Sequence, residues 1–588
     1  MIRSVTTENC LGKLLELRGA IWASAGTGRT LRLGLALWLL PVGVEVVASD
    51  LYVSPSGSPF ASGKRGDPYD LATTLSGRVG APGDTFWLMG GNYSVGHIDT
   101  RIEGTAGAPI TFRSVPGEWA RVDGSLSFFE SAGYVVLRDF ELFSSDANRV
   151  SAQVNVGFNP TDIHIVPGIA SYVPNLSFIN LVVHDQTRHG FYISQASSNN
   201  VVYGCVIYNN GWRSPDNAEG HGVYMQGWNG GRVLADNVVL NNSGVGMHVY
   251  ENDTNFYLAN IKLVGNVVFN AGAIQNVRAY RDWIVGVDWP AISADKIIFQ
   301  NNMGWYAKSP DQNNLVQLGR EGVNGSVAIL DNYLPQGLEV NNWTIAAVSG
   351  NTVGGKSTNN TVSLNQSQTG LSAVWNNNDY SASEPVGFQI GSAKLGFPGW
   401  QSATGFDTDS TCATGGFNGT VIFVRTNLYE AGRANIIVYN WNRDSTVAVD
   451  VRSVLSFGWP YEVRNAEDFA APPVLTGVFT NQLLDLPMTG LTTAIPNGAM
   501  LTAPPTGPAF NVFVLRQRAI RLRANLMGGQ LQISWPTNSG NWELQATPFA
   551  VSGATWKNVR GNPAVAGDRF VFMAPLDSAA RYYRLHAR

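Results

Sequence analysis

Three short segments decide the fold of this chain: HGFYI at residues 189–193, HGVYM at 221–225 and GMHVY at 246–250. Each is a strand-like run of apolar and aromatic residues led by a glycine, and the run returns about once per thirty residues. Repetition on this period is typical of a solenoid, in which each turn buries its apolar residues only against the neighbouring turns.

A second unit recurs between these segments, as an apolar run that ends in a polar step and usually Asn. Its copies are VVYGC at 201–205, VLADN at 233–237, IKLVGN at 261–266, IIFQNN at 297–302 and VAILDN at 327–332. Each run is too short for a helix and is closed by Asn or Gly turn chemistry. The sequence therefore predicts an all-β chain whose main part is a right-handed parallel β-helix.

The recurring asparagines have a structural explanation. Asn favours turns, and a residue that repeats once per turn of a solenoid lies directly beside its copies on adjacent turns. We expect a stacked ladder of turn residues, not a catalytic set, at Asn237, Asn266, Asn302, Asn332 and Asn351.

Composition narrows the function classes. Charged residues make up 14% of the chain, aromatic residues 11%, and the net charge is −4. Nucleic-acid binding needs a basic stripe, which the sequence lacks. Low charge with abundant polar and aromatic residues suits an extracellular β-protein that faces a neutral or weakly charged partner. We expect no nucleic acid as a partner, and a monomer.

The amino end is typical of an exported protein. Arg29 and Arg32 precede the apolar run LGLALWLL at 33–40, and the small residues Ala48 and Ser49 follow. A basic region, an apolar core and small residues form the order of a signal peptide, and this core is short for a membrane span. We expect residues 1–49 to be a signal-peptide region, no further transmembrane segment, and a secreted, extracellular or periplasmic protein.

The remaining chain divides into three predicted domains. Residues 50–384 form the β-helix, with a short helix between residues 67 and 76 that caps the open end of its core. Longer alternating strands from 385 to 518 predict a β-sandwich, and residues 519–588 a small immunoglobulin-like β-sandwich.

Candidate site residues follow from aligning the repeated segments on their glycines. The alignment places Tyr192, Tyr224 and His248 in one outward column, with adjacent turns about 4.8 Å apart. Residues 163–165 fit one turn earlier, which would set His164 above Tyr192. Four further residues lie beside this column: His189, His221, Gln226 and Tyr250. Outward tyrosines can stack on sugar rings without chemistry, and the histidines before the glycines can also simply close turns.

Charged and aromatic residues near the column extend the site. The long insertion at 211–220 offers Trp212 for sugar stacking and Glu219 as a carboxylate, because long solenoid loops build the walls of a binding face. Arg278 and Arg281 follow in a chain otherwise short of charge. We expect His248, Tyr224, Tyr192, His221 and Arg281 to act in catalysis, and the other named residues to bind substrate.

The amino-terminal part also resembles a known superfamily. YVSPSG at 52–57, PYDLAT at 68–73, PGDT at 82–85 and GGNY at 90–93 resemble the start of secreted right-handed β-helix proteins of the pectate lyase-like superfamily. The resemblance implies a polysaccharide lyase or glycoside hydrolase, and therefore an extracellular polysaccharide as the partner. Residues 420–515 look like the sandwich that many such enzymes carry. Alginate lyases and chondroitinase B use Lys and Arg near a calcium-assisted site, yet the repeated segments hold no Lys. No catalytic residue is therefore carried over, the metal ligands stay unassigned, and calcium is the one cofactor implied.

Three functions remain open from the sequence. In β-elimination on a uronate polymer, His248 would serve as base, Tyr224 as acid and an arginine as partner of the sugar carboxylate. Hydrolysis would instead need two carboxyl groups, for which Glu219 with Glu251 or Asp253 is the candidate set. A non-catalytic glycan-binding or adhesin-like β-helix is the third, since fold alone does not decide function.

Overall fold

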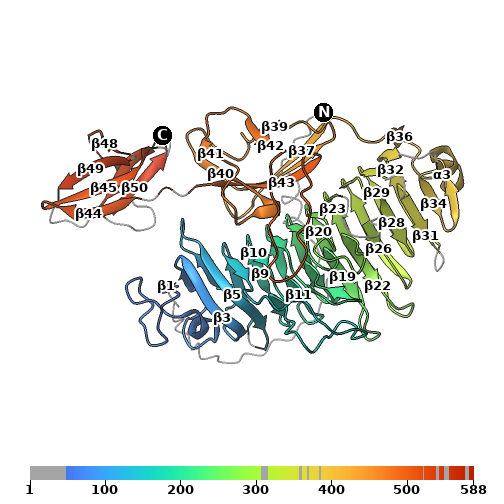
Figure 1. Ribbon diagram of the computed structural model, residues 1–588, viewed down its shortest axis with the longest axis horizontal. Coiled ribbons are helices and arrows are strands. Elements are labelled where there is room, and N and C mark those ends of the chain that lie inside the picture. Colours follow the sequence, from blue (N-terminus) through green and yellow to red (C-terminus); the bar gives the residue numbers. More distant parts are fainter. Residues whose placement is uncertain are drawn as a thin grey trace, which may run out of the picture.

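Figure 1 shows an elongated solenoid with two further β-units on one side of it. The computed structural model describes residues 48–130, 132–305, 316–355, 360–366, 370–382, 386–518, 520, 522–537, 542–548, 555–559, 561–567, 569–575 and 582–587. The predicted leader at 1–49 lies almost wholly outside these residues. No helix in the described part of the chain is long and apolar enough to cross a membrane.

The solenoid is a parallel β-helix with three faces, which confirms the predicted fold class. Its first face is a twelve-stranded parallel sheet to which each turn adds one strand. In order, the strands are β1 (Asp50–Val53), β2 (Thr85–Leu88), β4 (Ile110–Ser114), β6 (Val135–Arg138), β9 (Leu176–Ile179), β12 (Val201–Tyr203), β17 (Arg232–Ala235), β20 (Leu258–Val264), β23 (Ala294–Gln300), β26 (Asn324–Leu330), β29 (Trp343–Ser349) and β32 (Ser372–Asn376).

The second face, here called the sandwich face, is a ladder of short strands that the C-terminal part of the chain covers. It consists of β7 (Glu141–Phe143), β10 (Val182–His184), β13 (Val206–Tyr208), β18 (Val238–Leu240), β21 (Val267–Phe269), β24 (Met303–Gly304), β27 (Tyr333–Leu334), β30 (Thr352–Gly354), β33 (Asp379–Ala382) and β36 (Thr411–Thr414).

The third face, here called the histidine face, carries the three repeated segments. It consists of β8 (Ile169–Ser171), β11 (Phe191–Ile193), β16 (Val223–Met225), β19 (Met247–Glu251), β22 (Trp283–Val287), β25 (Val316–Leu318), β28 (Leu338–Asn341), β31 (Val362–Asn365), β34 (Phe388–Ile390) and the antiparallel β35 (Ala393–Leu395). The long strands β3 (Gly91–Thr100) and β5 (Ala120–Phe128) precede both ladders and pair with each other.

Glycine leads the repeated segments because adjacent turns approach closely there. A Cβ atom at Gly222 would lie 2.3 Å from the Val239 side chain and 2.7 Å from the carbonyl oxygen of Gly246. Both distances are too short for real atoms, so only glycine fits at this corner. The same reasoning applies to Gly190, whose Cβ would lie 2.7 Å from the carbonyl oxygen of Gly222.

The predicted asparagine ladder is present. The Oδ1 atom of Asn266 accepts the backbone N–H of Asn237 at 3.1 Å, and its Nδ2 donates to Asn302 at 3.1 Å. The same pattern continues through Asn332 and Asn351. These side chains are almost fully buried, so the ladder satisfies backbone groups inside the solenoid that water cannot reach.

The two ends of the solenoid differ from the prediction in detail. The predicted cap is a single-turn helix, α2 (Leu71–Leu75), whose Leu71 and Leu75 belong to the core and whose Asp70 accepts the N–H of Thr73. At the other end, parallel pairing continues past the expected boundary at 384 to β36, and α3 (Phe397–Thr404) packs its Trp400 into the core. The segment 385–414 lacks the repeat pattern that guided the prediction.

The C-terminal part forms two units of antiparallel sheet. In the first, β37 (Thr420–Thr426), β38 (Ala434–Asn440), β43 (Phe510–Gln517), β40 (Pro460–Asn465) and β41 (Leu475–Val478) face β39 (Thr446–Val449) and β42 (Leu484–Pro487), with the turn η1 (Ala466–Asp468) after β40. In the second, β44 (Arg523–Met527), β45 (Gln530–Pro536), β49 (Arg569–Pro575) and β48 (Ala564–Ala566) face β47 (Lys557–Asn558), β46 (Trp542–Thr547) and β50 (Tyr582–Ala587). The first unit is called the sandwich below.

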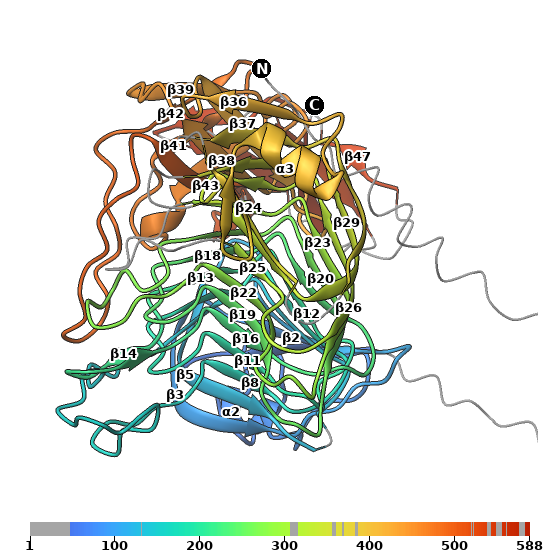
Figure 2. The ribbon, with the colours of Figure 1, turned by 90° about the vertical axis from the view of Figure 1, so that its right-hand side faces the viewer.

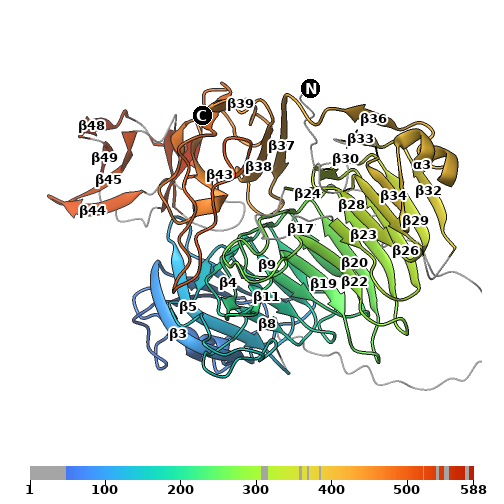
Figure 3. The same ribbon diagram turned by 45° about the vertical axis from the view of Figure 1, so that its right-hand side comes forward.

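The sandwich packs on the sandwich face of the solenoid (Figures 1 and 3). Outward apolar residues of that face, including Val206 and Val238, share one core with Ile437 and Val512 of the sandwich. The strands of the sandwich face are therefore buried on both sides, which explains their continuous apolar runs. The long loop at 488–509 descends along the solenoid, where the Asn497 N–H donates to Asp185.

Candidate active site

The repeated segments form adjacent strands of the histidine face. Tyr192 of β11 lies beside Tyr224 of β16, and Tyr224 beside His248 of β19. The ring centroids are 5.6 Å apart in the first pair and 5.2 Å in the second. The preceding residues Phe191 and Val223 point into the core and are fully buried. The structure thus contains the predicted outward column.

His164 does not belong to this column, so that prediction is wrong. The residue that pairs with Tyr192 from the preceding turn is Ala170 of β8. His164 is exposed and lies in a long excursion between β7 and β8, outside any strand. Gly168 was the better guide, because it precedes Ile169 and Ala170 just as Gly190 precedes Phe191 and Tyr192.

Three histidines are joined in a directed chain of hydrogen bonds. The Val245 N–H donates to Nδ1 of His221 at 2.9 Å, so His221 carries its proton on Nε2. That Nε2 lies 3.1 Å from Nδ1 of His248 and donates to it. His248 is therefore left with its own proton on Nε2, a buried atom that has no partner among the described residues. The third histidine, His189, accepts the backbone N–H of His221 on its Nδ1 at 3.0 Å.

This chain of hydrogen bonds changes the role that His248 can play. Reversing it would place a proton on Nδ1 of His221, directly against the Val245 N–H. The backbone thus holds His248 as a hydrogen-bond donor in its neutral form, and the predicted role as a base does not fit. A neutral imidazole N–H can instead stabilise negative charge that develops on a substrate.

The electrostatics keep all three histidines neutral. Burial, together with the positive charges of Arg188 and Arg278, lowers the pKa of His221 to about 3. Burial and the neighbouring His221 lower the pKa of both His189 and His248 well below the ordinary range. Removing an imidazolium from water is unfavourable when cations lie nearby, so the cluster carries no charge at neutral pH.

The insertion at 211–220 folds back against the cluster as a hairpin of β14 (Trp212–Arg213) and β15 (Ala218–Glu219), which stands out from the solenoid in Figure 2. Trp212 is fully buried, so it cannot stack on a sugar as we expected; the hairpin needs an apolar anchor of its own. Glu219 lies 3.2 Å from Arg188 and 3.9 Å from His189. Burial raises the pKa of Glu219, although Arg188 opposes this.

The arginines are distributed differently from the prediction. Arg281 forms an ion pair of 2.6 Å with Glu339 and thus points to the next turns of the solenoid. Arg278 lies 5.5 Å above the ring of Tyr280 and donates to Asn217 in the hairpin. Arg188, which sequence analysis missed, lies beside the cluster; its position directly before His189 was the available signal.

The tyrosines of the column are protonated. Burial raises the pKa of Tyr192 to about 12 and that of Tyr224 further above its usual range. The Tyr192 hydroxyl donates to Gln226 at 3.0 Å, whereas the Tyr224 hydroxyl makes no hydrogen bond with another described residue. Tyr250 is largely buried and its hydroxyl is bound to Asp288, so it closes the column instead of offering a free surface.

Metal binding was left open from the sequence. Among the described residues, one group could hold an ion: His189, Glu219 and His221, whose donor atoms lie within 4.8 Å of one another. Calcium prefers six to eight oxygen ligands, so this set does not fit it. A transition metal would need the Nε2 lone pairs of both histidines, but backbone N–H groups already occupy their Nδ1 atoms and hold the protons on Nε2.

One comparison with known proteins concerns the fold. A family model described as "Right handed beta helix region" matches residues 151–268, which contain the histidine cluster. Together with the parallel ladders, this supports a right-handed parallel β-helix.

Other comparisons find similarity to individual proteins that are named as lyases. The chain is 27% identical over 228 residues to "Pectate lyase PEL9" of Emericella nidulans, which covers 37% of this chain and about half, 54%, of that protein. Among solved structures, pectate lyase Pel9A has a TM-score of 0.34 at 14% identity and covers 56% of this chain and 78% of its own. A rhamnogalacturonan lyase has a TM-score of 0.37 at 14% identity, covering 56% and 84%. Structural similarities this distant carry no information on activity.

Proposed function

We propose that this protein is a polysaccharide lyase that cleaves a uronate-containing polymer by β-elimination at the histidine cluster. The observation that carries the proposal is the neutral, half-buried His248 with its unpartnered Nε2–H beside the free Tyr224 hydroxyl. The identity with a pectate lyase over 228 residues supports the same reaction class.

The residues divide into three roles. Arg188, Arg278 and the His248 N–H would offset the sugar carboxylate and thereby acidify the proton on C5. Glu219 would take this proton, since a carboxylate whose pKa is raised by burial is a better base. As the C4–O4 bond breaks and the C4=C5 double bond forms, the Tyr224 hydroxyl would donate its proton to the departing oxygen.

Hydrolysis is the second candidate, and one observation favours it. Burial raises the pKa of both Glu219 and Glu251, and the Glu251 Oε2 atom is buried with no partner among the described residues. A protonated and an ionised carboxyl group are what a glycosidase needs. In that case Glu251 would donate the proton, and Tyr224 would only bind the sugar.

The two reactions give different products, so one assay separates them. Polygalacturonate and alginate are incubated with the protein and followed by new reducing ends and by ultraviolet absorbance of unsaturated uronate. Both signals together indicate elimination, whereas reducing ends alone indicate hydrolysis. Binding of either polymer without any product would favour a non-catalytic glycan-binding protein.

Two matched pairs of variants test the roles. Tyr224→Phe and Glu219→Gln should each lower kcat about a hundredfold or more, because each removes a proton-transfer group. Tyr257→Phe and Glu103→Gln change exposed residues outside the site and should leave kcat unchanged. Full activity of the Tyr224→Phe variant would refute the proposed role of Tyr224 as the acid.

The same proposal includes an extracellular or periplasmic setting and a monomer. Its substrate is a polymer outside the cell, so the enzyme must be exported to meet it. Activity in the culture medium of the producing cells, with a single-chain mass in solution, is the expected observation.

A further inference from the structure

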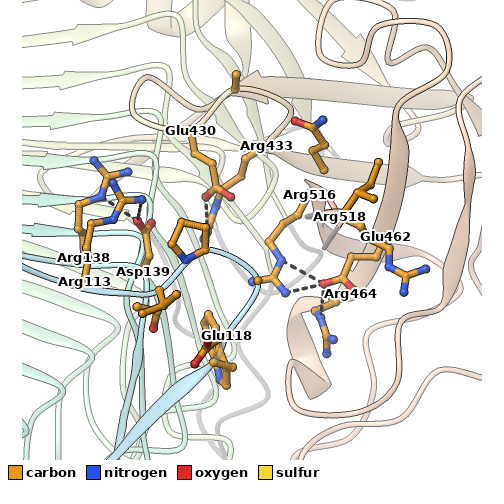
Figure 4. Close-up of a pocket in the computed structure, with 18 of the residues that line it drawn as sticks. Arg113, Glu118, Arg138, Asp139, Glu430, Arg433, Glu462, Arg464, Arg516 and Arg518 are labelled. Carbon is orange, nitrogen blue, oxygen red and sulfur yellow. Dashed lines mark hydrogen bonds and ion pairs between the residues drawn. The ribbon is translucent and has the colours of Figure 1, made fainter. Parts of the chain in front are cut away.

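A cleft lies where the first turns of the solenoid meet the sandwich, and none of the residues of the candidate active site lines it (Figure 4). Its volume is about 1270 Å³, which exceeds the usual range of about 300–1,000 Å³ for small-molecule pockets. Arg113, Arg138 and Asp139 form one wall, and Arg516, Arg518 and Glu462 face them from the sandwich.

The cleft gathers cations in a chain that has few. Eight arginines and five carboxylates line it among the described residues, and no lysine does. The arginines are Arg113, Arg121, Arg138, Arg433, Arg464, Arg516, Arg518 and Arg584; the carboxylates are Glu118, Asp139, Glu141, Glu430 and Glu462. The net charge of −4 for the whole protein makes this concentration of arginine a local feature.

One of the carboxylates is neutralised from outside the cleft. Glu118 pairs with Arg65 at 2.8 Å, and Arg65 does not line the cleft. Glu141 pairs with Arg121 of the cleft at 2.7 Å, and His184 also lies 3.1 Å from it. The positive excess inside is therefore larger than the lining residues alone suggest. Such a field attracts anionic ligands.

Two guanidinium groups keep capacity for a ligand. The Nε of Arg113 is buried and has no hydrogen-bond partner among the described residues, although its Nη2 donates to Asp139. Arg518 is exposed, and its guanidinium forms no ion pair with a described residue. A guanidinium presents parallel N–H groups that match a carboxylate, so both can bind one.

The remaining surface suits a sugar better than a nucleic acid. Tyr429 is 44% exposed, so one aromatic face is available for a pyranose ring. The carboxylates of Glu430 and Glu462 can accept hydrogen bonds from sugar hydroxyls. They would repel a continuous run of phosphates.

We propose that this cleft is a separate binding site for an acidic oligosaccharide, with the sugar carboxylates on the arginines and the sugar hydroxyls on the neighbouring carboxylates. It would anchor the polymer without taking part in its cleavage. The inference stands on the cleft alone and does not depend on the proposed lyase reaction.

Binding of a galacturonate hexamer to the full-length protein, measured by calorimetry in the Tyr224→Phe background to prevent turnover, tests this site. Arg518→Gln should weaken one class of binding about tenfold, since it removes a charge-assisted hydrogen bond to a sugar carboxylate. Arg518→Glu should abolish that class, and Arg101→Gln, an exposed arginine outside the cleft, should not change it. Arg518 is exposed, so neither variant should impair folding.

Three outcomes would overturn the proposal. The first is unchanged hexamer affinity in both Arg518 variants. The second is equal affinity for the fully methyl-esterified, uncharged hexamer. The third is sodium sulfate binding as tightly as the hexamer, which would indicate a site for any small anion. Absence of lyase activity in the unsubstituted protein would refute the proposed reaction and leave these measurements intact.

Discussion

Raising the pH from 6 to 9 should remove a stabilising contribution of His184 at the contact between the sandwich and the solenoid. This buried side chain lies 2.7 Å from Asp185 and 3.1 Å from Glu141. Burial alone would lower its pKa, but these two carboxylates outweigh burial and raise the pKa from 6.5 to about 8. Asp185 also accepts the N–H of Asn497 from the sandwich loop, so the network joins the two domains.

The pH dependence of the free energy of unfolding follows from the difference in the pKa of His184 between the folded and unfolded states. A group whose pKa is higher in the folded than in the unfolded state stabilises the fold below the unfolded value, and this contribution disappears as the pH rises through the folded value. A shift from 6.5 to about 8 corresponds to about 2 kcal/mol. The contribution should be nearly complete at pH 6 and absent at pH 9.

The measurement compares the unsubstituted protein with His184→Phe, which retains the ring stacking on Tyr208 at 4.7 Å but binds no proton. Urea unfolding at pH 6, 7.5 and 9 should show a stability difference that shrinks by about 2 kcal/mol across the series. His97→Phe, an exposed histidine of β3, controls for general effects of pH. A difference that stays constant from pH 6 to 9 would refute the reasoning.

Three other substitutions should act through named contacts. Asn266→Ala removes the ladder partner of Asn237 and Asn302 and should lower the free energy of unfolding by about 2–4 kcal/mol. The Asn237 amide should then exchange its hydrogen faster, whereas Asn252→Ala, at an exposed position, should leave that exchange unchanged. Trp212→Ala empties a fully buried site and should cost about 3–5 kcal/mol in urea unfolding, with the hairpin more open to proteases. Arg425→Ala leaves its buried partner Asp236 without a counter-charge and should cost about 3–5 kcal/mol, read as earlier detachment of the sandwich in urea.

Repetition explains what the sequence could predict. The register of Tyr192, Tyr224 and His248 followed from aligned glycines, and the ladder from Asn237 onward followed from a residue that recurs once per turn. Both depend on stacking between adjacent turns, which the period of the sequence encodes directly.

The errors fall where the chain leaves the repeat. His164 and Trp212 lie in excursions between strands, and excursions fold by their own contacts, which have no period to align. Arg281 follows another excursion, and its partner Glu339 is two strands further along the same face. The protonation of His248 depends on the N–H of Val245, a backbone group, and no side-chain pattern reports it.

The C-terminal sandwich covers strands that are synthesised much earlier, and this affects how the protein folds during synthesis. A ribosome makes Val206, Val238 and Val267 between 170 and 306 residues before Ile437 and Val512, which cover them in the finished protein. The apolar surface of the sandwich face is therefore synthesised early and stays exposed to other chains until the last strands of the sandwich are complete. A protein truncated near residue 418 should therefore be insoluble, because the sandwich face would stay exposed to water and to other chains.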